Sequence, residues 1–218
     1  KGAYKEKLGY LFGGRLLVYP IVEPKRKSGY AKVKAWIPEG KWTYIFTGDE
    51  YTIAKGGEYR TLQRTLESIP VLAGQGAIVP FSMDESNSIA NPKRIEIRIF
   101  GGNGEFDLFE DNREYGNDDE FTTKFVAEQA AKGQIVTICG VGNPGVIPAD
   151  RVLRVKFINA ADGNITVEKN GEKIEAKKIY EDCACAEFPF DATARYTVKL
   201  FSRDASETEK LKSRAKKI

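Results

Sequence analysis

Three acidic residues lie close together midway along the chain: Glu110, Asp111 and Glu114. Two carboxyl groups about 5 to 5.5 Å apart, or about 6.5 to 9.5 Å apart, are the arrangement with which most enzymes cleave glycosidic bonds. The three residues follow a strand-like segment, so the same pattern also fits a solvated acidic turn. The sequence therefore offers candidate carboxylates but identifies no positioned pair, and we assign no catalytic residue.

The same segment contains oxygen ligands suited to a hard cation such as calcium, on Asp107, Glu110, Asp111 and Asn112. Their spacing differs from that of an EF-hand loop, in which ligands alternate and a glutamate closes the loop. We therefore expect no metal site, and no other cofactor is indicated.

The chain contains no histidine, which excludes Ser-His-Asp and Cys-His nucleophiles and His-ligated zinc. It contains three cysteines, an odd number that rules out a complete disulfide framework. Cys183 and Cys185 are two apart on a predicted strand, so they share a face and a direct bridge would be strained. Reduced cysteines predict a reducing compartment, and we expect a cytoplasmic location.

The segment Gly140–Gly145 has the glycine spacing of a dinucleotide-binding fingerprint. That fingerprint needs a helix to begin behind the glycines, so that the helix N-terminus meets the pyrophosphate. Pro144 and Pro148 stand where this helix would begin, and we interpret the segment as a loop.

Four aromatic residues are candidates for stacking on sugar rings: Trp36, Trp42, Tyr44 and Tyr51. Strand aromatics at period two more commonly face a core or a neighbouring domain. The sequence leaves both interpretations open, so a carbohydrate-binding module remains an alternative function.

The elements that must position these residues are strands. Apolar residues alternate within Ala31–Ile37 and again within Trp42–Phe46, and Pro38-Glu39-Gly40 between them suits a type I turn. The pattern predicts a hairpin. Many short strands, frequent turn signals and little helical periodicity indicate an all-β chain with two antiparallel β-sandwich domains in series.

The domain boundary is expected near Ala90, giving domains 1–90 and 91–218. The pattern of Ile69–Phe81 predicts short buried strands that complete the first domain. The next segment, Ser82–Lys93, contains few large apolar residues, which is typical of a connector between domains.

Two further hairpins are predicted in the second domain. One has Ile95–Ile99 and Phe106–Leu108 as its arms around Gly101–Gly104. The other turns at Asn170-Gly171, a type I′ signal that fixes its register. This register pairs Lys169 with Glu172, Glu168 with Lys173, Val167 with Ile174 and Ile165 with Ala176. Near the C-terminus, Ser206–Lys217 fits either a short helix or a solvated tail.

Composition limits the partners. The 218 residues include 34 basic and 31 acidic side chains, for a net charge of +3, which is too small to indicate binding to nucleic acid or an anionic membrane. No apolar run approaches the roughly 18 to 20 residues of a membrane span, so we expect no membrane partner.

Four blocks occur in an order that resembles one known family. Leu11–Ile21, Trp36–Gly48 and Ile69–Pro80 resemble the region that directly follows the catalytic barrel in glycoside hydrolase family 31. Gly104–Asn112 is similar to the strand and acidic turn that open the last C-terminal domain of that family.

This resemblance implies an α-glucosidase, or alternatively an α-xylosidase, whose two catalytic aspartates lie on a (β/α)8 barrel that this chain lacks. The chain would then be non-catalytic, and its partner would be that barrel, which it covers and braces.

The resemblance also implies that apolar side chains near the start of the chain lose their covering when the barrel is absent: Tyr10, Leu11, Phe12, Leu16 and Tyr19. We expect some of them to be exposed. The chain would then either self-associate through this docking face or fold Lys1–Gly9 across it.

Overall fold

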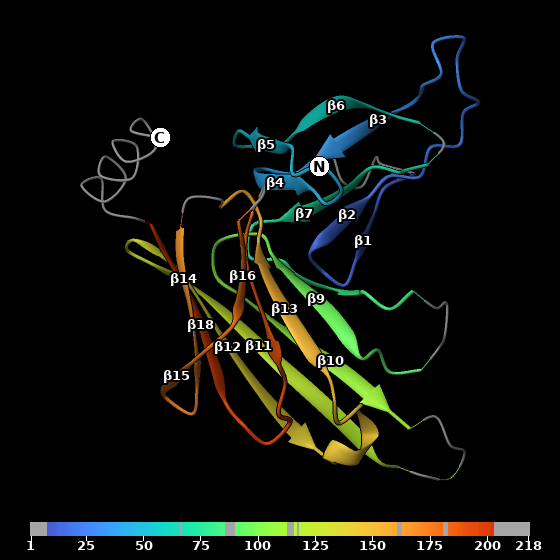
Figure 1. Ribbon diagram of the computed structural model, residues 1–218. Helices are drawn as coiled ribbons and strands as arrows, with labels where there is room; N and C mark the ends of the chain where they lie inside the picture. Colours follow the sequence, from blue (N-terminus) through green and yellow to red (C-terminus); the bar gives the residue numbers. More distant parts are fainter. Residues whose placement is uncertain are drawn as a thin grey trace, which may run out of the picture. The chain divides into compact units, whose positions relative to one another are not determined.

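The computed structural model describes residues 8–65, 67–85, 90–112, 116, 118–160, 163–180 and 183–202. The chain divides into two compact units, Lys1–Ala77 and Ile78–Ile218. In each unit the strands form two β-sheets (Figure 1). Side chains from both sheets pack into one apolar core, which confirms the all-β sandwich fold.

The first unit contains two sheets. The larger has the strand order β1-β2-β7-β4-β5, and the smaller pairs β3 with β6. Their bounds are β1 (Tyr10–Phe12), β2 (Leu16–Val18), β3 (Ala31–Ile37), β4 (Gly40–Tyr44), β5 (Glu50–Ile53), β6 (Glu58–Arg64) and β7 (Val71–Gly74).

The core of the first unit lies between these sheets. Alternate residues of β3 point into it, and its buried members are Leu17, Tyr19, Val33, Ala35, Ile37, Tyr44, Ile53, Leu62 and Leu72. The period-two pattern of β3 therefore identified the buried face correctly.

The predicted hairpin around Pro38-Glu39-Gly40 is wrong. Residues 31–37 pair with β6, whereas residues 40–44 pair with β5 and β7 in the other sheet. The chain crosses from one sheet to the other between Ile37 and Gly40. Alternation shows which side chains of a strand face the core, and two strands that face each other across a core alternate just as two hydrogen-bonded neighbours do.

The second unit contains two larger sheets, with the orders β10-β11-β12-β18-β14-β15 and β16-β17-β13-β9-β8. Their bounds are β8 (Ile78–Ser82), β9 (Arg94–Ile99), β10 (Gly104–Asp111), β11 (Glu120–Ala130), β12 (Gly133–Gly142), β13 (Val152–Phe157), β14 (Gly163–Lys169), β15 (Glu172–Ile174), β16 (Lys177–Tyr180), β17 (Ala184–Pro189) and β18 (Tyr196–Ser202).

Both sheets of this unit are antiparallel except at one place, where β9 and β13 run parallel. The core between the sheets includes Ile95, Ile97 and Ile99 from β9, and Phe121 and Phe125 from β11. The alternating isoleucines of β9 thus face inward, as their spacing predicts.

The hairpin predicted around Gly101–Gly104 is also wrong. The strand before it, β9, pairs with β8 and β13, and the strand after it, β10, pairs with β11 in the opposite sheet. The glycines carry the chain across the sandwich rather than back along one sheet.

The hairpin at Asn170-Gly171 is confirmed. The ladder pairs Lys169 with Glu172, Glu168 with Lys173 and Val167 with Ile174. Asn170 and Gly171 have φ values of 51° and 86°, as a type I′ turn requires. The fourth expected pair, Ile165 with Ala176, lies beyond this ladder, because β15 ends at Ile174.

The division between the units falls between Ala77 and Ile78, earlier than the boundary expected near Ala90. The reason is that β8 pairs with β9, from Ile78 opposite Ile99 to Ser82 opposite Ile95.

The helix or tail interpretation of Ser206–Lys217 lies outside the described residues. Within the part of the chain that the structure describes, no helix has the length and apolar character needed to cross a membrane.

Candidate functional site

Glu110, the first of the candidate carboxylates, lies in a buried ion pair. Its carboxylate accepts hydrogen bonds from both terminal nitrogens of Arg151, at 2.5 and 2.7 Å. Glu110 is 6% exposed and Arg151 is 1% exposed. Arg151 also donates from Nε to the carbonyl of Pro92, at 3.0 Å. Both oxygens of Glu110 are therefore engaged by a structural partner, which leaves this carboxylate poorly suited to proton transfer.

The other acidic residues do not converge on it. Glu110 and Asp111 are neighbours within β10, so their side chains point to opposite faces of the sheet. Asp107 forms an exposed ion pair with Lys124, 2.8 Å long. Glu114 lies outside the described residues. Residues 107–111 are thus a strand, not a turn, and this geometry does not form the calcium site considered from the sequence.

The glycine-rich segment continues as a single 3-10 turn, η2 (Pro144–Val146), after β12 ends at Gly142. The side chain of Asn143 accepts a hydrogen bond from the amide of Gly145 at 2.9 Å. Residues 140–142 belong to β12, so only the end of the segment is a loop. A turn of this length lacks the helix that would meet a pyrophosphate.

The four candidate stacking aromatics are divided between the two sheets of the first unit. Tyr44 is buried in the core, and Trp42 and Tyr51 pack against that core. Trp42 donates from Nε1 to the carbonyl of Pro38 at 2.9 Å. Trp36 lies on β3, in the other sheet. These side chains therefore do not form one exposed platform.

The three cysteines are free thiols. Cys183 and Cys185 are buried and Cys139 is half-buried. Burial raises the pKa of the Cys185 thiol, which disfavours the reactive thiolate. Among the described residues, no group of three or more acidic, cysteine or histidine side chains is placed to hold a metal ion.

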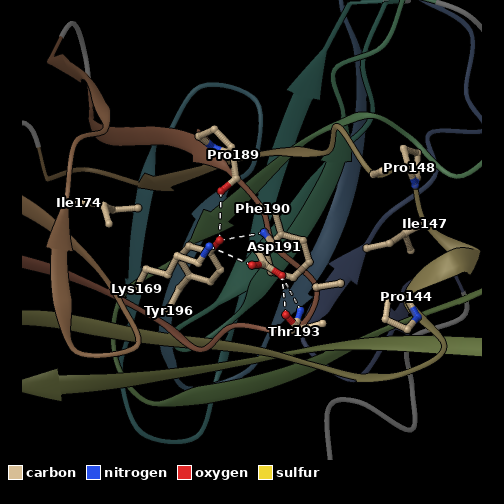
Figure 2. Close-up of a pocket in the computed structure, with 12 residues that line it drawn as sticks. Pro144, Ile147, Pro148, Lys169, Ile174, Pro189, Phe190, Asp191, Thr193 and Tyr196 are labelled. Carbon is tan, nitrogen blue, oxygen red and sulfur yellow. Dashed lines mark hydrogen bonds and ion pairs between the residues drawn. The ribbon is translucent and has the colours of Figure 1, made fainter.

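A cavity of about 530 Å³ in the second unit was not anticipated from the sequence (Figure 2). Its lining comes from segments that are far apart in the chain: Pro144, Ile147, Pro148 and Ala149 around η2, Lys169 and Ile174 on the β14–β15 hairpin, Pro189–Thr193 from the last residue of β17 onward, and Tyr196 on β18. No periodic pattern joins these segments, so only the folded chain brings them together.

The polar centre of this cavity is Asp191. Its carboxylate accepts hydrogen bonds from the amide and the hydroxyl of Thr193, at 2.9 and 2.7 Å, and pairs with the ammonium of Lys169 at 2.9 Å. The hydrogen bonds from Lys169 and Thr193 lower the pKa of Asp191 to about 2. The same contact with Asp191 raises the pKa of Lys169. Both groups are therefore charged at neutral pH.

An apolar tip lies near the start of the first unit. Tyr10, Leu11 and Phe12 form β1 and are 51%, 58% and 64% exposed. Leu16 is half-buried and Tyr19 is fully buried, its hydroxyl donating to the carbonyl of Trp36 at 2.5 Å. Some of the five apolar residues are thus exposed, as expected, and they are the residues of β1.

Comparison with known proteins identifies relatives of this chain. The family described as "Glycosyl hydrolase family 31 C-terminal domain" matches residues 1–79. An α-xylosidase of Saccharolobus solfataricus is 27% identical over 106 residues, which is 47% of this chain and 14% of that protein. The α-xylosidase XylQ of Lactiplantibacillus pentosus is 32% identical over 76 residues, 35% of this chain and 9% of that protein.

Among solved structures, a family 31 dextranase of Flavobacterium johnsoniae in complex with glucose superposes with a TM-score of 0.74 and 20% sequence identity. The match covers 93% of this chain and 28% of the dextranase, and it includes both units. A crystal structure of a glucosidase II alpha subunit matches with a TM-score of 0.62 and 18% identity, over 89% of this chain and 24% of that chain. The chain therefore spans less than a third of each of these relatives.

Proposed function

Since this chain corresponds to the C-terminal region of family 31 glycoside hydrolases, we propose that it is the non-catalytic β-sandwich region of a larger retaining α-glycosidase. Its role is to cover and brace a catalytic barrel. The chemistry then belongs to carboxylates on that barrel and not to this chain.

The exposed tip of β1 is the observation that carries this proposal. Three consecutive large apolar side chains, Tyr10, Leu11 and Phe12, are each more than half exposed. Tyr10 and Phe12 share one face of this edge strand and Leu11 lies on the other. Large apolar side chains exposed together at the tip of a strand favour contact with another protein surface. The tip lies within residues 1–79, the part of the chain that matches the family, and a catalytic barrel is the partner that the family supplies.

The state of Glu110 supports a non-catalytic role. A glycosidase needs one carboxyl group that donates a proton and a second that attacks or activates water. The bidentate contact with Arg151 instead stabilises Glu110 as a buried anion. Asp111 lies on the opposite face of β10 and does not complete a pair with it.

The specificity of the parent enzyme is either α-glucoside or α-xyloside hydrolysis. The sequence resemblance implies an α-glucosidase, with an α-xylosidase as the alternative. The two α-xylosidases found by sequence comparison favour the α-xylosidase alternative. We further propose a cytoplasmic location, supported by the free thiols of Cys139, Cys183 and Cys185.

Three measurements test this function. The reading frame upstream of Lys1 should encode a barrel with a family-type catalytic aspartate, and that barrel, expressed with and without residues 1–218, should be more heat-stable with them. The purified 218-residue chain should not hydrolyse p-nitrophenyl α-glucoside or α-xyloside. Turnover by the chain alone that is abolished by Glu110→Gln or Asp111→Asn would overturn the proposal, as would a barrel whose stability and activity do not depend on this region.

A further inference from the structure

The cavity in the second unit has preformed apolar walls. Figure 2 shows Pro144, Ile147 and Pro148 on one side of the cavity and Ile174 on the other, with Phe190 between them. Proline rings lose little side-chain entropy on contact with a ligand, because they are already rigid. The walls can therefore receive an apolar surface without reorganising.

The segment that carries the polar groups is also held in place. The hydroxyl of Tyr196 accepts from the amide of Asp191 at 2.8 Å and donates to the carbonyl of Pro189 at 3.3 Å. The ring of Tyr196 stacks on the ring of Phe188, with centroids 5.2 Å apart, and lies beside the ring of Phe190, with centroids 5.6 Å apart. Asp191 and Thr193 are thereby oriented before any ligand arrives.

The Lys169–Asp191 pair presents a donor beside an acceptor. An ammonium group has three N–H donors, and the contact with Asp191 requires one of them. Each carboxylate oxygen has further lone pairs beyond those used by Lys169 and Thr193. The side chains of Lys169 and Asp191 are 36% and 43% exposed, so both groups remain accessible to a ligand.

We propose that this cavity is a binding site for a neutral saccharide, such as a ring of the oligosaccharide on which the parent enzyme acts. A sugar ring has an apolar face, which matches the proline and isoleucine walls. Its adjacent hydroxyl groups can accept from Lys169 and donate to Asp191 at the same time. A volume of about 530 Å³ falls within the usual range of small-molecule sites, about 300 to 1,000 Å³.

Charge distinguishes this ligand class from others. A phosphate or a nucleotide would approach the carboxylate of Asp191, which stays ionised because its pKa is about 2. A cation would approach the ammonium of Lys169. Asp191 would repel the anion and Lys169 would repel the cation. A neutral ligand with paired hydroxyl groups is repelled by neither side chain, because the pair carries no net charge.

This inference rests on the proposed function for its choice of saccharide, but separate experiments can refute the saccharide site and the bracing role. Saccharide binding is measured on this chain without any barrel, and the bracing role is measured as the stability of a barrel without any added sugar. A chain that braces the barrel and binds no sugar would refute only the inference drawn here.

The test is a titration of the isotope-labelled 218-residue chain with maltotriose, isomaltotriose and isoprimeverose, followed by amide NMR. Saturable shifts are expected for the amides of Lys169, Asp191 and Thr193. Lys169→Met keeps the apolar stem and removes the donor, and should weaken binding about tenfold or more, as expected for loss of a hydrogen bond to a charged group. Ala149→Trp should fill the cavity from the wall around η2, which does not carry Lys169.

Lys124→Met is the matched control, because it removes the same charge from an exposed ion pair outside the cavity. It should leave the affinity unchanged, and the amide spectra of all three variants report whether they are folded. Binding that is weakened by Lys169→Met and Ala149→Trp but not by Lys124→Met supports the site. The absence of saturable shifts with every sugar would overturn it, as would saturable binding that neither cavity variant affects.

Discussion

The carboxylate of Glu110 and the guanidinium of Arg151 form a buried, bidentate ion pair between residues 41 positions apart in the chain. The pair joins the end of β10 to the segment that precedes β13, and through Arg151 Nε it also holds the carbonyl of Pro92. The residue that the sequence offered as a candidate acid is therefore a structural anchor of the second unit.

Removing the cation alone should destabilise the second unit strongly. Arg151→Met leaves the Glu110 carboxylate buried without its partner, and such losses cost about 3 to 5 kcal/mol in the free energy of unfolding. Urea denaturation at pH 7 measures this. The double variant Glu110→Leu with Arg151→Met should recover much of the loss, because an apolar pair can replace a buried ion pair. Lys124→Met, which breaks an exposed pair, should cost about 1 kcal/mol or less. A loss for Arg151→Met no larger than that of Lys124→Met would contradict the prediction.

Asp191 should make stability depend on pH in the acid range. Its pKa is about 2 in the folded chain, against an ordinary value of 3.8. A lowered folded-state pKa means that the contribution is complete above about pH 4 and is lost as the pH falls through 2. Because the side chain is 43% exposed, we expect this contribution to be below about 1 kcal/mol.

NMR titration of the Asp191 carboxyl carbon tests the cause of this shift. In Lys169→Met the pKa should rise towards 3.8, since the largest contribution comes from Lys169. Thr193→Val should raise it less. An unchanged pKa in Lys169→Met would show that the ion pair does not form in solution.

The turn between β14 and β15 should require glycine at position 171. Gly171 has a φ of +86°. For a residue with a Cβ, the left-handed conformation is roughly 1 to 2 kcal/mol higher in free energy. Gly171→Ala should lower the free energy of unfolding by about that amount, measured by urea denaturation. Lys173→Ala, an exposed change on the adjacent strand, serves as the control and should cost less. Equal effects of the two substitutions would argue against the type I′ turn.

The tip of β1 should govern self-association of the isolated chain. At about 25 cal/mol per Å², several hundred Å² of exposed apolar surface corresponds to several kcal/mol of driving force for association. Replacing both Leu11 and Phe12 by serine should reduce the sedimentation coefficient and the binding of a dye specific for apolar surface. Val22→Ser, at a 70% exposed position outside β1, is the control. A monomeric wild-type chain without dye binding, unchanged on deletion of residues 1–9, would place the docking face elsewhere.

Limited proteolysis should first cut between Phe81 and Lys93, a segment poor in large apolar residues. The carboxylate of Asp84 accepts from the amides of Lys93 and Arg94, at 2.8 and 3.1 Å, so the ends of this segment stay close. Because β8 pairs with β9, the two fragments should co-elute in native buffer and separate only in denaturant. Fragments that separate in native buffer would instead support a boundary near Ala90.

The sequence by itself determined the local features of this protein. Alternating apolar residues identified the buried faces of β3 and β9, because side chains of a strand alternate between its two faces. Asn170-Gly171 determined a hairpin and its register, because few residue pairs tolerate the φ values of a type I′ turn. The lack of histidine excluded imidazole chemistry.

Outside that hairpin, the tertiary structure decided which strands become partners and which polar groups meet. Alternation shows which face of a strand is buried but does not specify the strand that lies beside it. The pairing of β3 with β6 rather than β4, and the parallel pairing of β9 with β13, therefore could not be predicted from it. The anchoring of Glu110 by Arg151, and the cavity around Asp191, depend on segments that are distant in the chain and share no periodic pattern. These contacts arise only when the two sheets of the second unit close on their common core, because that packing sets the distances between residues that the chain itself leaves far apart.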